Sequence, residues 1–318
     1  MSNLFLGIDG GGSKTLALIA DESGNVIGRG SAESSNYHSV GKEKAFESLN
    51  NAIRFAFDDA KLSRQNFQAA CLGLAGVYRP QDRAVIESWA KENLANTPVK
   101  IVNDAELVLA AGAADGWGVA MICGTGSIVY GRNKNGETTR AGGWGYLLGD
   151  EGSGYRIGLA ALQAIVRAHD GRDESTILQS SILNHLSLNS PVDLIKYIYR
   201  ERVPTTEIAA LASFVEEAAE SGDTAATRIL QEAAHELSLA AKSVVRQLRM
   251  TGAIPCAQAG GVITRGKMIA VMFRESAHAM GLALHPIQPV IEPAQGAIRL
   301  AIDFRVPKIS EFLKNSEI

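Results

Sequence analysis

Short apolar runs alternate with glycine-rich turns at the start of the chain. Thr15–Ala20 reads TLALIA, the turn Asp21–Asn25 follows it, and an extended pattern resumes over Val26–Gly30. Short apolar runs bounded by Gly, Asn, Asp and Ser are typical of strands joined by hairpin turns. With the apolar residues that precede Gly10, the pattern predicts a strand, a glycine turn, a strand, a second turn and a third strand.

The same succession returns farther along the chain. An apolar run from Val119 reaches the turn Gly124–Ser127, and a second extended stretch leads to another turn, Asn133–Gly136, before a third extended piece. Two glycine hairpins could resemble each other by chance. The shared order of strands and turns favours a duplicated domain core instead.

Helix and strand patterns alternate between the two hairpins. An apolar spacing of 3.6 residues predicts helices, and short buried runs that end at Gly or Asn predict strands. The predicted elements are helix Glu43–Leu62, strand and glycine turn Gln68–Gly76, helix Arg83–Leu94, strand Val99–Asn103 and a helix that begins at Asp104. Strands that alternate with helices indicate an α/β protein with a largely parallel component.

Helical patterns dominate after Gly149, and an α/β stretch follows them. The predicted helices span 153–167, 174–186, 191–200, 206–220 and 223–250, and the last has one continuous apolar face. Strand 256–261, helix 266–281, strand 287–292 and helix 293–302 come next. We expect an N-terminal α/β domain of residues 1–115 and a C-terminal α/β domain of residues 116–292 with a helical insertion. The helix at about 293–304 is expected to return to the first domain.

Composition and charge exclude several classes of function. The chain has 318 residues, of which 46% are hydrophobic and 20% charged, as in ordinary globular proteins of about two domains. Its formal charge of −3 is unlike that of a nucleic-acid-binding protein. There is no basic leader and no apolar run of about 18 residues, so we expect a cytoplasmic protein without a membrane segment. Cys71, Cys123 and Cys256 lie far apart in apolar stretches, which predicts buried thiols.

The first glycine turn resembles a phosphate-binding loop of the Walker type. Gly7 and Gly12 have the Walker spacing, but Ser13 separates Gly12 from Lys14 and Thr15. A Walker loop also opens a helix, whereas a strand is predicted here. A hairpin can still present backbone N–H groups to an anion, because glycine has no Cβ in the way. Such turns also occur without a ligand, and Lys14 could simply be a solvated lysine.

Carboxylates and an exposed indole are the further candidates for chemistry. Asp9 could hold Mg²⁺ through water. Asp104 could accept the proton of an attacking hydroxyl, or could only cap the helix that it opens. The stretch GGWGYLLGDEGSGY, 142–155, joins Trp144 to Asp150 in a way suited to holding a sugar, and the turn at 259–262 could lie against adenine. Asn36 could contact the sugar or be an ordinary loop residue.

Taken together, these motifs resemble the BadF/BadG/BcrA/BcrD-type ATPases, and in particular their N-acetylglucosamine kinase branch. The segments FLGIDGGGSKT, SSNYHSVG, CLGLAG, IVNDA, ICGTGSIVYGR, GGWGYLLGDEGSGY and QAGGV follow one another in the order of that family. The resemblance runs from residue 5 to about residue 300. It implies the actin/Hsp70/sugar-kinase fold, a duplicated ribonuclease H-like α/β architecture with two domains around an ATP cleft.

The resemblance also implies a role for each motif. Asp104 would be the catalytic base, and Asp9 would hold Mg²⁺ through water. The residues implied to bind ATP are Gly10, Gly11, Gly12, Ser13, Lys14, Thr15, Gly124, Thr125, Gly126, Ser127, Gly260 and Gly261. Those implied to bind the sugar are Asn36, Gly143, Trp144, Gly145 and Asp150. The chain has Leu74-Ala75-Gly76 where mammalian members carry a serine and two glycines, so this sugar contact does not carry over.

The expected activity is phosphorylation of the 6-hydroxyl of N-acetylglucosamine by ATP and Mg²⁺. Glucosamine, N-acetylmuramic acid or a neutral hexose are alternative substrates, and an ATP-hydrolysing regulator is the alternative of another class. An activator with an iron–sulfur cluster would need suitably placed cysteines, which the three apolar cysteines are not. We expect a small sugar as the partner molecule, neither nucleic acid nor membrane, and from the family a possible homodimer.

Overall fold

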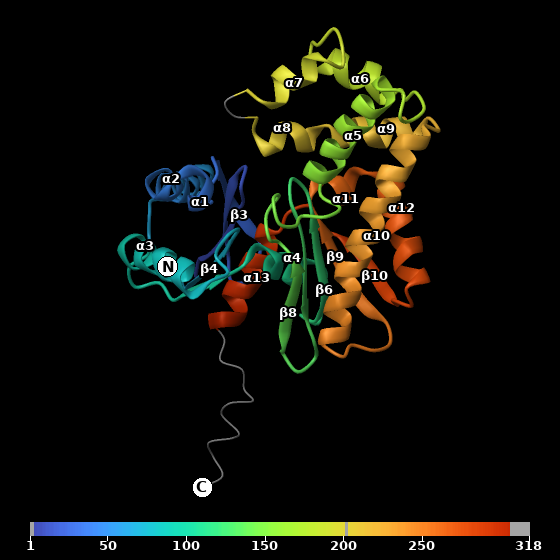
Figure 1. Ribbon diagram of the computed structural model, residues 1–318. Coiled ribbons are helices and arrows are strands. Elements are labelled where there is room, and N and C mark those ends of the chain that lie inside the picture. The colour runs from blue at the N-terminus through green and yellow to red at the C-terminus, as the bar shows by residue number, and fades with distance from the viewer. Residues whose placement is uncertain (1–2, 201–202, 306–318) are drawn as a thin grey trace. The chain divides into compact units, whose positions relative to one another are not determined.

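The computed structural model describes residues 3–200 and 203–305, and the chain forms two compact α/β units (Figure 1). One unit takes in Met1–Ala114 and Glu292–Ile318, and the other Asp115–Ile291. The chain therefore leaves the first unit, builds the whole of the second, and returns to the first with helix α13 (Ala294–Arg305).

The sheet of the first unit has the strand order β3-β2-β1-β4-β5. The first three strands in the chain pair antiparallel, whereas β1, β4 and β5 run parallel. Gly10 pairs with Thr15 beside the first turn, so the predicted glycine hairpin is confirmed. The strands are β1 (Phe5–Gly10), β2 (Thr15–Ala20), β3 (Val26–Ala32), β4 (Ala69–Leu74) and β5 (Val99–Val102).

Helices cover both faces of this sheet. Leu6 and Ile8 of β1 share a buried cluster with residues of α2 and α3, whereas Phe5 lies in a cluster with α4 and α13. Gly7 allows α13 to approach closely, since a Cβ there would lie 2.7 Å from the Ile298 nitrogen. The helices of the unit, besides α13, are α1 (Tyr37–Val40), α2 (Lys42–Asp59), α3 (Pro80–Asn93) and α4 (Asp104–Gly112).

The second unit repeats the sheet of the first. Its strand order is β10-β9-β6-β7-β8, with β6, β7 and β8 antiparallel and β6, β9 and β10 parallel. Read from the antiparallel edge, both sheets have the same arrangement, which confirms the predicted duplication. The strands are β6 (Gly118–Cys123), β7 (Ser127–Arg132), β8 (Thr138–Gly142), β9 (Ile254–Ala259) and β10 (Leu284–Pro289).

The long helix α10 packs on this second sheet (Figure 1). Leu237 and Ala241 on its apolar face are buried. None of the helices in residues 3–200 and 203–305 is long and apolar enough to cross a membrane. The helices of the unit are α5 (Gly154–His169), α6 (Leu178–His185), α7 (Asp193–Ile198), α8 (Thr205–Ala210), α9 (Ala212–Glu220), α10 (Thr224–Gln247), α11 (Gly261–Arg265) and α12 (Lys267–Ala279).

Some local expectations were wrong. The strand expected at 256–261 is β9, which ends at Ala259, and α11 begins at Gly261. The span 206–220 is two helices, α8 and α9, which meet at the buried Leu211. The strand expected at 287–292 begins at Leu284, because β10 is an edge strand and an edge strand tolerates Pro286, which lacks an N–H. The stretch after Asn36, expected to be a loop, contains the short helix α1.

Candidate active site

The first glycine turn joins β1 to β2 as a tight hairpin. The Gly11 N–H donates to the Lys14 carbonyl at 2.9 Å, which leaves Gly12 and Ser13 exposed at the tip. Ser34 Oγ donates to the Gly11 carbonyl at 3.0 Å and fixes the base of the turn. The backbone N–H groups at the tip are therefore held in place and open to an anion.

Two side chains near this turn have internal roles that the sequence did not reveal. The Thr15 hydroxyl donates to the Glu33 carbonyl at 2.7 Å, and Thr15 is fully buried. Ser35 Oγ is buried without a hydrogen-bond partner and lies where a Cβ at Gly10 would be. Gly10 is thus needed for packing against Ser35, whatever the turn binds.

Asp104 is the first residue of α4, directly after β5. The helix cap is the preceding residue: Asn103 accepts from the Glu106 N–H at 3.0 Å. Asp104 itself accepts from the Ala105 N–H at 3.0 Å. The alternative in which Asp104 caps the helix is therefore wrong, because the side chain of Asn103 does so.

Asp9 and Asp104 are close enough to repel each other electrostatically. Burial raises the pKa of Asp9 to about 7, and the negative charge of Asp104 acts in the same direction. The positive charge of Lys14 opposes this change. Burial also raises the pKa of Asp104. Asp9 lies near the end of β1, and Asp104 follows the end of β5. Both strands are parallel members of one sheet, and the carboxyl ends of parallel strands share one edge.

The surroundings of Asp9 fit a Mg²⁺ ion that is shared with phosphate. Burial and the charge of Asp104 disfavour the ionised form of the Asp9 carboxyl, and a nearby cation would favour it. Within residues 3–200 and 203–305 no three His, Cys, Asp or Glu side chains are grouped as a complete metal cage. Mg²⁺ is usually held in this way, by one or two carboxylates together with water and substrate phosphates.

The second glycine turn, Gly124–Ser127, is tied to the start of α5. The Gly154 N–H donates to the Gly124 carbonyl at 2.8 Å, and the Tyr155 N–H to the Thr125 carbonyl at 3.2 Å. The Ser127 hydroxyl donates to the Glu151 carbonyl at 2.7 Å. Carbonyl groups of the turn thus face the helix, so the turn and α5 form one rigid element.

The turn at Gly260-Gly261 lies beside this second hairpin. A Cβ at Gly124 would be 3.7 Å from the Gly260 Cα, because β6 and β9 are parallel neighbours. Gly260 has φ +94° and packs on the Cys123 carbonyl, so only glycine suits the position. The guanidinium of Arg265 lies over Gly261. Arg265 was not among the predicted site residues, although it stands four residues after Gly261, one helical turn away.

The stretch Gly142–Asp150 forms a compact series of turns. Gly142, Gly143 and Gly145 all have positive φ, and the Gly143 N–H donates to the Ser127 carbonyl at 2.9 Å. Trp144 is 64% exposed, with the Arg140 guanidinium 4.5 Å from its ring centroid. The predicted exposed indole is confirmed, and exposed indoles are suited to stacking on a ligand.

Asp150 lies in the same stretch but points inward. It is only 9% exposed and accepts hydrogen bonds from the backbone N–H groups of Ser127 and Gly145. Burial outweighs these bonds and raises the pKa of Asp150. Its carboxylate therefore joins the glycine-tryptophan turn to the second glycine hairpin.

Asn36 lies in the first unit and caps α1. Its Oδ1 accepts from the His38 N–H at 3.2 Å, and a Cβ at Gly76 would be 3.2 Å from the same oxygen. Ala75 donates to the Gly10 carbonyl at 2.8 Å. The end of β4 thereby connects Asn36 to the segment that carries Asp9.

The buried carboxylate of Asp82 contacts side chains of the short helix α1, next to Asn36. Asp82, at the start of α3, accepts from the Tyr37 hydroxyl, and from Arg79 Nε at 2.8 Å. His38 Nε2 lies 3.2 Å from Asp82 Oδ1. Hydrogen bonds from Tyr37 and Arg79 outweigh burial, which acts in the opposite direction, and lower the pKa of Asp82 to about 2.

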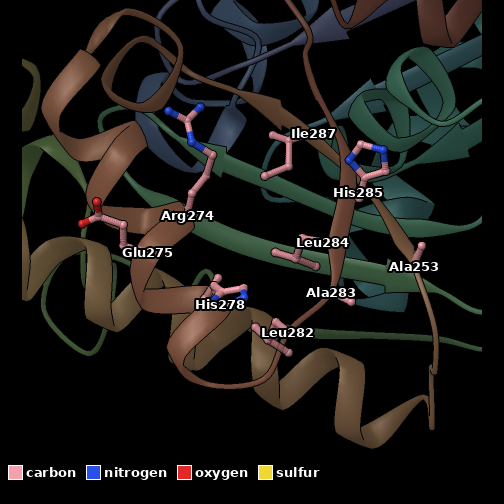
Figure 2. Close-up of a pocket in the computed structure, with 10 residues that line it drawn as sticks. Ala253, Arg274, Glu275, His278, Leu282, Ala283, Leu284, His285 and Ile287 are labelled. Atoms are coloured by element: carbon pink, nitrogen blue, oxygen red, sulfur yellow. The ribbon is translucent and has the colours of Figure 1, made fainter.

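A separate cavity of about 440 Å³ lies between α12 and β10 in the second unit (Figure 2). Leu282, Leu284 and Ile287 contribute apolar surface, and the Glu275 carboxylate and the His285 imidazole lie on opposite sides of the view. None of the predicted site residues lines it. Its polar groups do not converge, so the glycine turns and carboxylates remain the candidate site.

Known proteins match this chain over almost its full length. Residues 6–301 match the model of the BadF/BadG/BcrA/BcrD ATPase family. An N-acetylmuramic acid/N-acetylglucosamine kinase from Clostridium acetobutylicum is 42% identical over 85% of this chain and 89% of its own. An N-acetyl-D-glucosamine kinase from Dictyostelium discoideum is 33% identical over 94% of this chain and 98% of its own.

A solved structure also resembles the chain. It is a protein from Chromobacterium violaceum provisionally assigned as an N-acetylglucosamine kinase. It superposes with a TM-score of 0.73 and 25% identity, over 94% of this chain and 99% of that one. With the duplicated sheets, this likeness confirms the predicted sugar-kinase fold.

Proposed function

The chain belongs to the BadF/BadG/BcrA/BcrD ATPase family, and we propose that within it the protein is an ATP-dependent amino-sugar kinase. The proposal is carried by the position of Asp104, whose carboxylate follows the carboxyl end of a parallel strand. This carboxylate does not cap α4, because Asn103 does. Its neighbour Asp9 provides the second carboxylate that phosphoryl transfer with Mg²⁺ requires.

The chemical step assigned to Asp104 is orientation of the sugar hydroxyl. The hydroxyl oxygen attacks the γ-phosphorus of ATP in line, the bond from that phosphorus to the β-phosphate oxygen breaks, and ADP leaves. The hydroxyl proton passes to the Asp104 carboxylate late in the reaction. Mg²⁺, held by Asp9 through water, would neutralise charge on the phosphates.

The two glycine hairpins are assigned to ATP. In Gly10–Thr15 and Gly124–Ser127, carbonyl groups of the turn accept hydrogen bonds from the rest of the protein. The N–H groups of Gly11 and Gly124 donate within their own turns, so the phosphate oxygens are assigned to the N–H groups at the turn tips. Gly260-Gly261 would receive adenosine, with Arg265 placed to stack on a flat ring.

The sugar is assigned to Asn36, the Gly143-Trp144-Gly145 turn and Asp150. N-acetylglucosamine, phosphorylated at its 6-hydroxyl, is the first substrate that we propose, because both curated relatives described above are kinases of that sugar. N-acetylmuramic acid is the second, since the relative from Clostridium acetobutylicum is also a kinase of it. The use of ATP and three buried unpaired cysteines fit a cytoplasmic location.

A substrate panel tests the proposal. ADP release would be measured with Mg²⁺ and ATP in the presence of N-acetylglucosamine, glucosamine, N-acetylmuramic acid, N-acetylmannosamine, glucose or no sugar. We expect a rate that depends on an amino sugar, with the phosphate found on the 6-oxygen by NMR. A uniform rate across the panel, equal to that without sugar, would replace the kinase with an ATP-hydrolysing regulator.

A further inference from the structure

Asp150 combines two features that are unfavourable by themselves. Its side chain is a carboxylate in a residue only 9% exposed, and its backbone adopts φ +59°, the left-handed region that non-glycine residues rarely enter. Such a conformation persists where the surrounding structure holds it, and it often marks a functional position.

The contacts of the Asp150 carboxylate account for its burial and for the left-handed backbone at this residue. One of its donors is the N–H of Ser127, in the glycine turn assigned to ATP phosphate, and the other is the N–H of Gly145, in the turn assigned to sugar. Hydrogen bonds to an ionised acceptor are about twice as strong as those between neutral groups. One side chain therefore holds the backbone of two turns that are assigned to different substrates.

Packing against Gly126 makes the same connection. A Cβ at Gly126 would lie 2.8 Å from Asp150 Oδ2, closer than a carbon and an oxygen can pack. The glycine in the phosphate turn is thus matched to the position of the carboxylate. The Gly143 N–H also donates to the Ser127 carbonyl, at 2.9 Å. This hydrogen bond connects the same two turns, but it joins neutral groups.

We propose that Asp150 is a positioning residue that fixes the sugar turn and the phosphate turn relative to each other, so that it sets the affinity for both substrates. The proposal rests on the kinase function above and adds an inward role to the sugar contact assigned to the same residue. An ionised carboxylate has about four acceptor positions, so two backbone donors leave room for a sugar hydroxyl.

Kinetics of Asp150→Asn test the proposal. Asn tolerates left-handed backbone and keeps the shape of the side chain, while the charge is removed. We expect the KM for ATP and the KM for the sugar each to rise at least about fivefold, from the loss of hydrogen bonds to a charged group. Trp144→Ala should raise only the sugar KM, and Glu151→Gln, the adjacent exposed carboxylate, should change neither by more than about twofold.

Gly126→Ala disturbs the same contact from the other side and serves if Asp150→Asn does not fold. It should raise both KM values as well. In the double variant Gly126→Ala/Asp150→Asn the two losses should not add, because both substitutions break one contact. Additive losses would show that the two residues act separately.

Calorimetric binding separates this proposal from the kinase function. The wild-type protein is titrated with Mg²⁺-ADP alone and with N-acetylglucosamine alone, and Asp150→Asn in the same way. Wild-type protein that does not bind N-acetylglucosamine would remove the kinase function for that sugar. Sugar binding by the wild type, with unchanged ADP affinity in Asp150→Asn, would overturn the positioning role and leave the kinase function intact.

Discussion

At the scale of single residues, neighbouring side chains divide the work at the start of α4. Asn103 satisfies the N–H of Glu106 and so closes the helix end. Asp104 accepts from the N–H of Ala105 next to it. A substitution at Asp104 therefore changes the chemistry of the site without removing the helix cap.

Asp104→Asn should retain sugar binding and lose turnover. Asn keeps the size of the side chain but cannot accept the hydroxyl proton, so kcat should fall about 10²–10⁴-fold, the range for loss of a general base. The sugar Kd, measured by calorimetry, should stay within about threefold of the wild-type value. Glu106→Gln, in the same helical turn, is the control, and normal turnover by Asp104→Asn would remove Asp104 from its assigned role.

Asp82 should make stability depend on pH. Its pKa is about 2 in the folded protein, below the value of about 3.9 for a free aspartate, because Tyr37 and Arg79 donate to the ionised form. The stabilisation is therefore complete above about pH 4 and is lost as the pH falls toward 2. His38 also faces this carboxylate.

Urea unfolding of the wild type and Asp82→Asn checks this. The difference in free energy of unfolding should be largest near pH 7 and should shrink between about pH 4 and pH 2. Asp58→Asn, an exposed carboxylate on α2, is the control. A difference that stays constant over this range would mean that the charge of Asp82 does not stabilise the fold.

At the scale of elements, hairpins and parallel strands were readable from the sequence, whereas inward-facing polar contacts were not. The glycine turns bounded by apolar runs gave β1–β2 and β6–β7, and the strand ends placed Asp9 and Asp104 at one edge. Asp150 could not be read in the same way. Its inward direction depends on a left-handed backbone and on donors more than twenty residues away in the case of Ser127.

Edge position and local capping explain why the structure differs from the sequence prediction at β10 and α1. β10 contains Pro286 and still forms a strand, because its outer edge needs no N–H partner. α1 has only four residues, too few for an apolar period, and Asn36 starts it by a side-chain cap. Neither property leaves a periodic signal in the chain.

The close packing of β3 on α2 gives a prediction at this scale. Gly30 faces the helix, and a Cβ there would overlap the Ala52 carbonyl oxygen and the Ala56 nitrogen. Backbone atoms cannot move aside as a flexible side chain can, so Gly30→Ala should destabilise the protein by about 1–3 kcal/mol. Thermal unfolding measures this. Ser31→Ala, exposed on the same strand, is the control, and equal melting temperatures for both variants would contradict the packing argument.

At the scale of the whole molecule, duplication explains why two unrelated stretches of sequence carry the same kind of turn. In each unit the glycine hairpin joins the central strand to its antiparallel neighbour, and parallel strands follow on the other side. The units then differ in the further groups assigned to the substrates: Asp9, Asn36 and Asp104 in the first, and the Trp144 turn with Asp150 in the second. One inherited scaffold thus carries two kinds of binding group.

The return of α13 to the first unit also has a consequence for protein synthesis. The helix packs on Gly7 at the start of the chain, yet the ribosome must make all of Asp115–Ile291 before it. At about 5–20 residues per second this takes about 9–35 s, during which the helix is missing from the newborn first sheet. The second unit, continuous in sequence, can fold in that interval.

A chain that stops at Ile291 would capture this intermediate. Its second unit retains a complete sheet and its own buried cluster, whereas its first unit lacks the helix that covers Phe5 and Cys71. Limited proteolysis should therefore cleave within residues 3–114 and spare 115–291, while the full-length chain resists at both. If the two parts resisted equally in the shortened chain, the first unit would fold without its last helix. Otherwise the nascent chain has an uncovered apolar face for chaperones to bind until α13 has been made.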